Sequence, residues 1–110
     1  MPEEEQMTFS MAAPAPGTKH KILVIEDHKD IRLYMKVLFG ANYTVIMAEN
    51  GEEGVRLARK EMPDIILSDV MMPKMDGFEC TRILKEDVKT CHIPIILLTA
   101  LVGDMDIVKG

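Results

Sequence analysis

Four short, uninterrupted apolar runs are the feature that most constrains the fold of this chain. They are ILVI at 22–25, VIMA at 45–48, IIL at 65–67 and IILL at 95–98. Apolar residues that follow one another without alternation are typical of strands buried on both faces of a parallel sheet. We therefore predict strands over residues 22–25, 43–50, 64–69 and 93–100.

Amphipathic segments between and after these runs predict helices over residues 28–40, 50–63, 76–88 and 103–110. Apolar residues at helical spacing mark one face of the first and third helices: Ile31, Tyr34, Met35 and Leu38, then Cys80, Leu84 and Val88. Asn50 is a suitable N-cap, and Gly40 and Pro63 are suitable helix ends. Strands that alternate with helices predict an open α/β fold with a parallel sheet.

Composition and charge limit the classes of protein to which this chain can belong. Hydrophobic residues make up 47% and charged residues 28% of 110 residues, which favours one soluble domain. No apolar run approaches the roughly 20 residues that span a bilayer, and the N-terminus lacks a secretory signal, so we expect a cytoplasmic protein without membrane contact. A net charge of -5 argues against direct nucleic-acid binding.

The cysteines and histidines argue against special cysteine chemistry and a zinc site, and the N-terminal composition marks the start of the folded domain. Cys80 and Cys91 form no Cys-x-x-Cys pair and are interpreted as ordinary thiols. The three histidines are scattered, which argues against a zinc site. Residues 1–19 contain acidic residues, proline and alanine and are predicted to be a flexible linker or tail, whereas residues 20–110 form the folded domain.

Polar residues follow the apolar runs at the points where the predicted strands end. Glu26 and Asp27 follow the first run, Asp69 the third and Thr99 the fourth. Ligands of open α/β sheets bind at the carboxyl ends of the strands, so these side chains should meet at one edge. Carboxylates about 4 Å apart repel by on the order of 4 kcal/mol at an effective dielectric constant of 20.

A bound cation or a proton relieves that repulsion, and an all-oxygen site favours Mg²⁺ over Zn²⁺. Because Mg²⁺ commonly works together with phosphate oxygens, the cluster predicts phosphoryl chemistry. The alternative is that the acids are solvated loop residues beside helix N-termini.

Three segments, VIED, LSDVMMPKMDG and IILLTA, resemble the motifs of response-regulator receiver domains from two-component signalling. The resemblance runs from about Lys21 to the C-terminus and implies a flavodoxin-like (βα)n receiver fold with an open parallel sheet. It also implies a phosphoprotein of signal transduction or phosphorelay, which accepts a phosphoryl group from the phosphodonor domain of a histidine kinase. Such a domain catalyses its own phosphorylation and dephosphorylation and is a switch rather than a metabolic enzyme.

The resemblance also assigns roles to single residues. Asp69 is the phosphoacceptor, Asp27 a direct Mg²⁺ ligand and Glu26 a ligand through water. The backbone carbonyl of Met71 is a further Mg²⁺ ligand, and the Thr99 hydroxyl is the switch that binds the phosphoryl group. Pro73 and Gly77 shape the loop after Asp69, and Met72 and Met75 pack against the core.

This sequence departs from the family after Thr99, because the usual fifth strand, its Lys-Pro pair and the fifth helix are missing from the eleven residues that follow. Lys109 falls in the predicted fourth helix and is not assigned the catalytic role, so no catalytic lysine is present in this chain. The lost apolar burial is on the order of 10 kcal/mol, comparable with the net stability of a domain. Two explanations are open: the chain is a piece of a longer protein, such as a hybrid sensor kinase, or a partner molecule covers the fourth strand or the first helix by self-association.

Three functions are compatible with these residues. The first is a phosphoacceptor module that uses Asp69 and Mg²⁺. The second is a receiver fragment that cannot be phosphorylated and acts as an interaction module. The third is an acid-cluster phosphohydrolase with His28 as base, which fits less well because short loops leave little room for a substrate pocket; His28 is interpreted as a residue of the loop or helix start.

Overall fold

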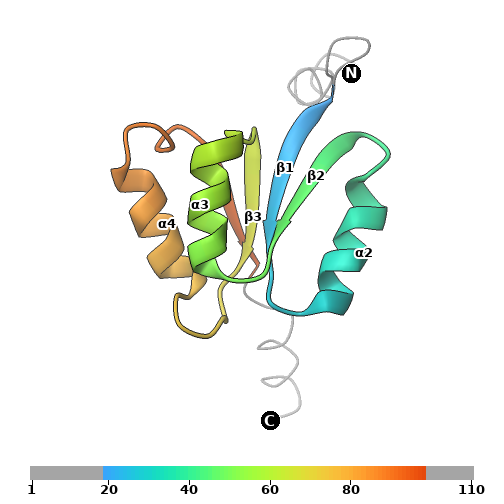
Figure 1. Cartoon of the computed structure of the whole chain (residues 1–110), viewed down its shortest axis with the longest axis horizontal. Coiled ribbons are helices and arrows are strands. Elements are labelled where there is room, and N and C mark those ends of the chain that lie inside the picture. Colours follow the sequence, from blue (N-terminus) through green and yellow to red (C-terminus); the bar gives the residue numbers. More distant parts are fainter. Residues whose placement is uncertain (1–18, 99–110) are drawn as a thin grey trace, which may run out of the picture.

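The fold consists of parallel strands joined by helices, as the computed structural model shows for residues 19–98 (Figure 1). In chain order the elements are β1 (His20–Ile25), α2 (Lys29–Phe39), β2 (Tyr43–Ala48), α3 (Gly51–Glu61), β3 (Ile65–Asp69), α4 (Gly77–Glu86) and β4 (Ile95–Leu98). The predicted alternation of strands and helices is confirmed over this range. Residues 1–18 of the predicted linker or tail at 1–19, Thr99 and the predicted helix at 103–110 lie outside the described residues.

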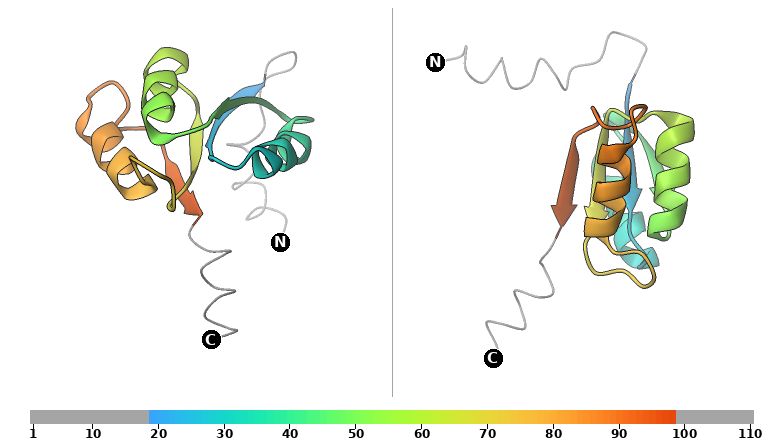
Figure 2. Two further views of the ribbon diagram at one scale, coloured as in Figure 1. Left: turned by 60° about the horizontal axis from the view of Figure 1, so that its bottom comes forward. Right: turned by 90° about the vertical axis from the view of Figure 1, so that its left-hand side faces the viewer.

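The four strands form one sheet in the order β2-β1-β3-β4, and each neighbouring pair is parallel. Ile25 of β1 is in register with Ala48 of β2 and with Ser68 of β3, so these three strands end at the same edge. The helices α3 and α4 cover one face of the sheet and α2 covers the other (Figures 1 and 2). The predicted open α/β sheet is therefore correct.

The first strand is buried on both faces, as its uninterrupted run predicts. Leu23 and Ile25 point into the larger core, beneath α3 and α4, where they meet Leu84. Ile22 and Val24 point to the opposite face and pack with residues of α2. Burial of a side chain of this size stabilises the fold by about 1.5–3 kcal/mol.

The helix α2 forms where it is predicted, and none of its residues is buried. Its apolar face is largely exposed: Tyr34 is 63% and Leu38 is 52% accessible. The helix α2 rests mainly on β1 and β2. Of its side chains, Met35 and Phe39 pack against the smaller core. The hypothesis that a partner molecule covers this helix stays a prediction.

The helix ends follow the capping signals in the sequence. The Asn50 side chain accepts a hydrogen bond from the backbone N–H of Glu53 at 2.8 Å, as expected of an N-cap, and Gly40 is the C-cap directly after α2. The placement of Val88 on a helix face was wrong, because α4 ends at Glu86 and Val88 is 83% exposed. None of the helices in residues 19–98 is both long and apolar enough to cross a bilayer.

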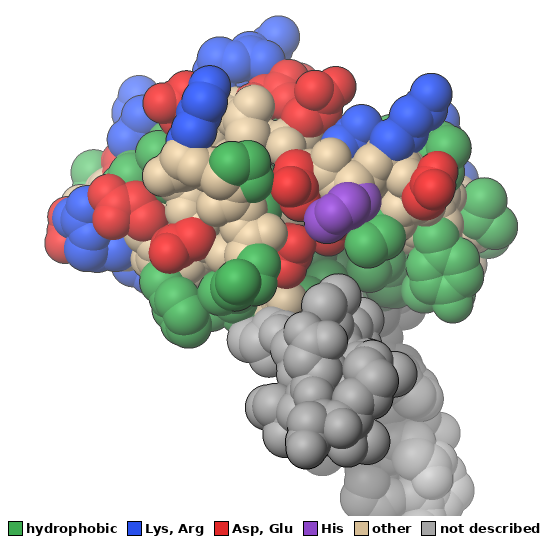
Figure 3. Space-filling model, turned by 90° about the horizontal axis from the view of Figure 1, so that it is seen from below, with side chains coloured by type: hydrophobic (Ala, Val, Ile, Leu, Met, Phe, Trp, Pro, Cys, Tyr) green, Lys and Arg blue, Asp and Glu red, His purple; other side chains and the backbone are tan. Residues whose placement is uncertain are grey.

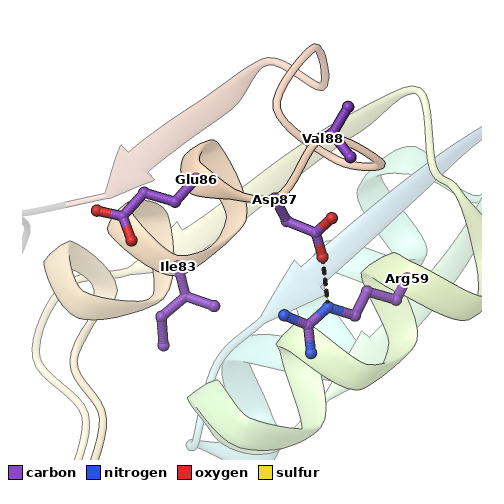
Figure 4. Close-up of a pocket in the computed structure, with 5 residues that line it drawn as sticks. All are labelled: Arg59, Ile83, Glu86, Asp87 and Val88. Carbon is purple, nitrogen blue, oxygen red and sulfur yellow. Dashed lines mark hydrogen bonds and ion pairs between the residues drawn. The ribbon is translucent and has the colours of Figure 1, made fainter.

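Asp87 stops α4 and ties it to α3 (Figure 4). One carboxylate oxygen accepts the backbone N–H of Lys89 at 2.9 Å, and the other accepts Nε–H of Arg59 at 2.8 Å. Asp87 and Arg59 belong to a surface pocket that is lined by Arg59, Ile83, Glu86, Asp87 and Val88. The hydrogen bond from Lys89 and then the Arg59 guanidinium lower the pKa of Asp87 below its ordinary value of 3.8.

The lowered pKa of Asp87 predicts a specific pH dependence of stability. The carboxylate contributes stability that is fully present above pH 3.8, its ordinary value, and that is lost as pH falls through the lower pKa of the folded state. We expect Asp87→Asn to lower Tm at neutral pH, and the difference from the wild type to shrink in strong acid. Thermal melts across the acid range test this, and a difference that stays constant with pH contradicts it.

Candidate functional site

Three carboxylates and one imidazole meet at the carboxyl end of the sheet. Glu26 and Asp27 directly follow β1, and Asp69 is the last residue of β3, the neighbouring strand. One ligand atom from each of Glu26, Asp27, His28 and Asp69 lies within 4.8 Å of all the others. Figure 3 views the molecule from this end and shows acidic side chains gathered around a histidine.

Glu26 is the most deeply buried member of this cluster, with 4% of its surface exposed. Its Oε2 accepts the backbone N–H of His28 at 2.9 Å and lies 2.7 Å from Nδ1 of the His28 ring. Burial raises the pKa of the Glu26 carboxyl, the hydrogen bonds from His28 partly oppose this, and the Asp69 charge raises it further. The buried acid is thus held in one orientation by the residue that begins α2.

Asp27 and Asp69 complete the carboxylate cluster. Among the residues that the structure describes, Asp27 Oδ1 is shielded from solvent and has no hydrogen-bond partner. Asp69 Oδ1 accepts the backbone N–H of Met71 at 3.2 Å. Buried polar atoms without a partner are rare in native proteins, and a bound cation is one group that satisfies them.

The loop after Asp69 returns sharply to the sheet. The backbone N–H of Gly77 donates to the carbonyl of Val70 at 2.9 Å, and Lys74 has a positive φ of 69°. Asp76 caps α4 by accepting the N–H of Glu79 at 2.9 Å. The loop therefore brings the start of α4 directly beside Asp69.

The structure bears on some of the predicted site residues and not on others. The convergence of Glu26, Asp27 and Asp69 agrees with the prediction. Met72 is 8% exposed and belongs to the larger core, and Met75 packs against that core, as expected. The Met71 carbonyl stays a predicted ligand. Thr99 lies outside the described residues, so its contribution stays a prediction as well.

Two further residues lie near the cluster, and of these the sequence analysis considers only His28, as a candidate base. His28 does begin a helix, as interpreted, but the scattered histidines gave no sign that its Nδ1 lies among the carboxylates. Arg32, one turn into α2, is only 13% exposed and donates from Nη1 to the Glu26 carbonyl at 2.8 Å. Arg32 therefore fixes the backbone that presents both acids.

This donor set fits a hard divalent cation. It offers carboxylate oxygens from three residues, and one of these, Asp27, carries a buried oxygen that has no hydrogen-bond partner within residues 19–98. Mg²⁺ prefers oxygen ligands and keeps several waters, which suits a cluster at the rim of a sheet. Asp27 and Asp69 are the residues best placed to bind it, with Glu26 behind them.

Known proteins share both the sequence and the fold of this chain. Residues 22–110 match the family model of the response regulator receiver domain. Histidine kinase P4 of Formosa agariphila is 46% identical over 82 residues, which are 74% of this chain and 6% of that protein. Response regulator PleD of Caulobacter vibrioides is 45% identical over 91 residues, which are 82% of this chain and 20% of that protein.

The solved structure of another receiver domain contains a metal ion. The receiver domain of the sensor histidine kinase PA1611 from Pseudomonas aeruginosa PAO1 has a magnesium ion coordinated in its active site cleft. It matches with a TM-score of 0.72 and 30% identity, over 81% of this chain and 75% of that chain. This chain spans only a small part of the length of the two curated relatives. Their shared segment, the family match and the parallel sheet with acids at its carboxyl end show that the chain belongs to the response regulator receiver domain family of two-component signalling.

Proposed function

We propose that this chain accepts a phosphoryl group on Asp69 from a phosphohistidine of a histidine kinase, with Mg²⁺ as the cofactor. The observation that carries the proposal is the convergence of Glu26, Asp27 and Asp69 within 4.8 Å at the carboxyl end of the sheet. Receiver domains bind Mg²⁺ at an acidic site and interact with histidine kinase phosphodonors. The kinase partner and the cytoplasm as location are part of the proposal for this chain.

Asp69 acts as the nucleophile. Its Oδ1 is held by the Met71 N–H, so we assign the attack to its other carboxylate oxygen. That oxygen bonds to phosphorus as the phosphorus–nitrogen bond of the phosphohistidine breaks, which leaves an acyl phosphate on Asp69 and returns the electron pair to the imidazole. Water later cleaves the acyl phosphate and restores the carboxylate.

The neighbouring acids make this transfer depend on the cation. A phosphoryl group adds about 1.5 to 2 negative charges beside Glu26 and Asp27. When bound, Mg²⁺ supplies positive charge that offsets this repulsion. Asp27 and Asp69 hold the ion, Glu26 orders a water ligand, and the Met71 carbonyl and the Thr99 hydroxyl complete the site as proposed ligand and phosphoryl-binding group.

Direct phosphorylation tests the proposal. The full chain is incubated with acetyl phosphate and Mg²⁺, and its intact mass is followed with time. We expect the mass of one phosphoryl group to be gained, lost again at alkaline pH, and absent with excess chelator. Borohydride reduction followed by peptide mass spectrometry should place the acyl phosphate on Asp69. A folded sample without mass gain would instead support an interaction module that is not phosphorylated.

Replacing Asp27 by asparagine tests the assignment of the metal ligand. We expect Asp27→Asn to weaken Mg²⁺ binding by at least about a hundredfold, because a direct ligand is lost. The metal-free protein should lose little or no stability, since Asp27 Oδ1 has no hydrogen bond to lose within residues 19–98, and the removal of one like charge offsets the weakened attraction to His28 Nδ1 at 3.3 Å. Isothermal titration calorimetry and thermal melts measure both effects, with Asp30→Asn on exposed α2 as the control. A variant that loses stability yet binds Mg²⁺ normally contradicts the assignment.

A further inference from the structure

His28 stands at the start of α2 without serving the usual purpose of an N-cap side chain. Its backbone is extended, with φ -91° and ψ 122°, and its side chain makes no capping hydrogen bond to the helix. The ring instead turns back toward the acids that follow β1. Nδ1 lies 2.7 Å from Glu26 Oε2 and 3.3 Å from Asp27 Oδ1.

The distance between Nδ1 and Asp27 Oδ1 fits two neighbouring ligands of one metal ion. Metal–ligand distances of about 2.1 Å place adjacent ligands of an octahedral ion about 3.0 Å apart, and these two atoms are 3.3 Å apart. The 2.7 Å to Glu26 Oε2 is the length of a hydrogen bond, so a proton on Nδ1 must leave before the ring binds an ion, while Glu26 keeps its place behind a water ligand. The Asp27 oxygen is also the buried atom that has no hydrogen-bond partner among the described residues, so a cation bound between the two atoms would satisfy it.

A nitrogen donor changes which ions such a site prefers. Carboxylate and carbonyl oxygens suit Mg²⁺, whereas imidazole suits first-row transition ions such as Co²⁺, Ni²⁺ and Zn²⁺. His28 is 63% exposed in its side chain, so its ring can move by small amounts to meet an ion without disturbing the core. The backbone that carries it is fixed by the bond from Arg32 to the Glu26 carbonyl.

We propose that His28 Nδ1 is a ligand in the acidic site and gives this receiver a preference for first-row transition ions over Mg²⁺. The inference rests on the proposed function, because it concerns the same site. It differs from a purely positioning role, in which His28 would only hold the Glu26 carboxylate through the hydrogen bond. In that case its loss would weaken Mg²⁺ and Co²⁺ binding by the same factor.

Pulsed EPR of Mn²⁺ bound to the full chain tests ligation directly. The spectra are recorded at about pH 8, with and without isotope-labelled histidine. We expect a nitrogen hyperfine coupling that changes with the label and disappears in His28→Gln. The matched control is His20→Gln, since His20 pairs with Asp64 at 3.3 Å at the other end of β1 and should keep the coupling.

The affinities provide the second readout. The ratio of Co²⁺ to Mg²⁺ affinity, measured by calorimetry, should fall by about tenfold or more in His28→Gln and stay unchanged in His20→Gln. Mg²⁺ and Mn²⁺ binding without nitrogen coupling, together with an unchanged ratio, overturns the role of His28 and leaves the proposed function standing. A folded wild-type chain that binds none of these ions overturns both. The labelled wild-type spectrum decides the matter even where a variant folds poorly.

Discussion

Asp69→Asn is expected to leave the chain without detectable phosphorylation by acetyl phosphate in the presence of Mg²⁺. An amide oxygen is a far weaker nucleophile than a carboxylate oxygen, and the proposal assigns the other two carboxylates of the site, Glu26 and Asp27, to the metal rather than to the phosphoryl group. Asparagine retains an oxygen that can accept the Met71 N–H, now 3.2 Å from Asp69 Oδ1, so the local geometry should persist. The loss is therefore chemical rather than structural.

The stability of the Asp69→Asn protein shows whether phosphorylation is lost because the nucleophile is gone or because the protein unfolds. Removing one of three neighbouring carboxylates relieves repulsion, so the metal-free variant should melt at least as high as the wild type. Asp30→Asn makes the same change of charge on the exposed first turn of α2 and should keep full phosphorylation. A mass gain in Asp69→Asn at the wild-type rate would place the acceptor elsewhere and refute the assignment.

The fold was predictable because local patterns and tertiary packing agree along most of the chain. The continuous run at 22–25 predicts burial on both faces of the sheet, and alternate residues of β1 do enter the two cores. The meeting of Asp27 with Asp69 was also predictable, since parallel neighbours end at one edge. Both predictions follow from rules that depend only on where strands end.

Features that depend on a single backbone turn were not predictable. Val88 keeps helical spacing with Leu84, yet the Asp87 carboxylate accepts the Lys89 N–H and ends α4 first. His28 joins the acids only because the chain between β1 and α2 turns the ring back toward Glu26. Helical spacing also cannot tell which part of an amphipathic face has a neighbour: Met35 packs against the sheet, whereas Tyr34 is exposed.

Gly77→Ala is expected to destabilise the protein and to weaken Mg²⁺ binding at once. A Cβ on residue 77 would lie 2.5 Å from the Asp69 carbonyl oxygen, 2.9 Å from Val70 Cα and 3.1 Å from the Leu97 side chain. Two of these atoms are backbone, and Asp69 is fixed by its register with Leu98 in the sheet. The overlap can therefore be relieved only by moving α4 or the end of β3.

The magnitude follows from two opposing terms. Alanine favours the helix over glycine by about 1 kcal/mol, whereas overpacking of this kind costs typically 1–3 kcal/mol and more where backbone must shift. We expect a net loss of about 2 kcal/mol, which lowers Tm by roughly 10 °C in a domain of this size. Because the displaced backbone is that of Asp69, Mg²⁺ affinity should fall by about tenfold.

A neighbouring substitution separates this steric effect from a general sensitivity of α4. Phe78 follows Gly77 and is 60% exposed, so Phe78→Ala should change the free energy of unfolding by less than about 0.5 kcal/mol and leave Mg²⁺ binding intact. Thermal melts and calorimetric titrations of the two variants measure this contrast. Equal stability of Gly77→Ala and the wild type would show that the start of α4 can withdraw from β3 at no cost. The close approach of this helix would then have no part in holding the Asp69 carboxylate in place.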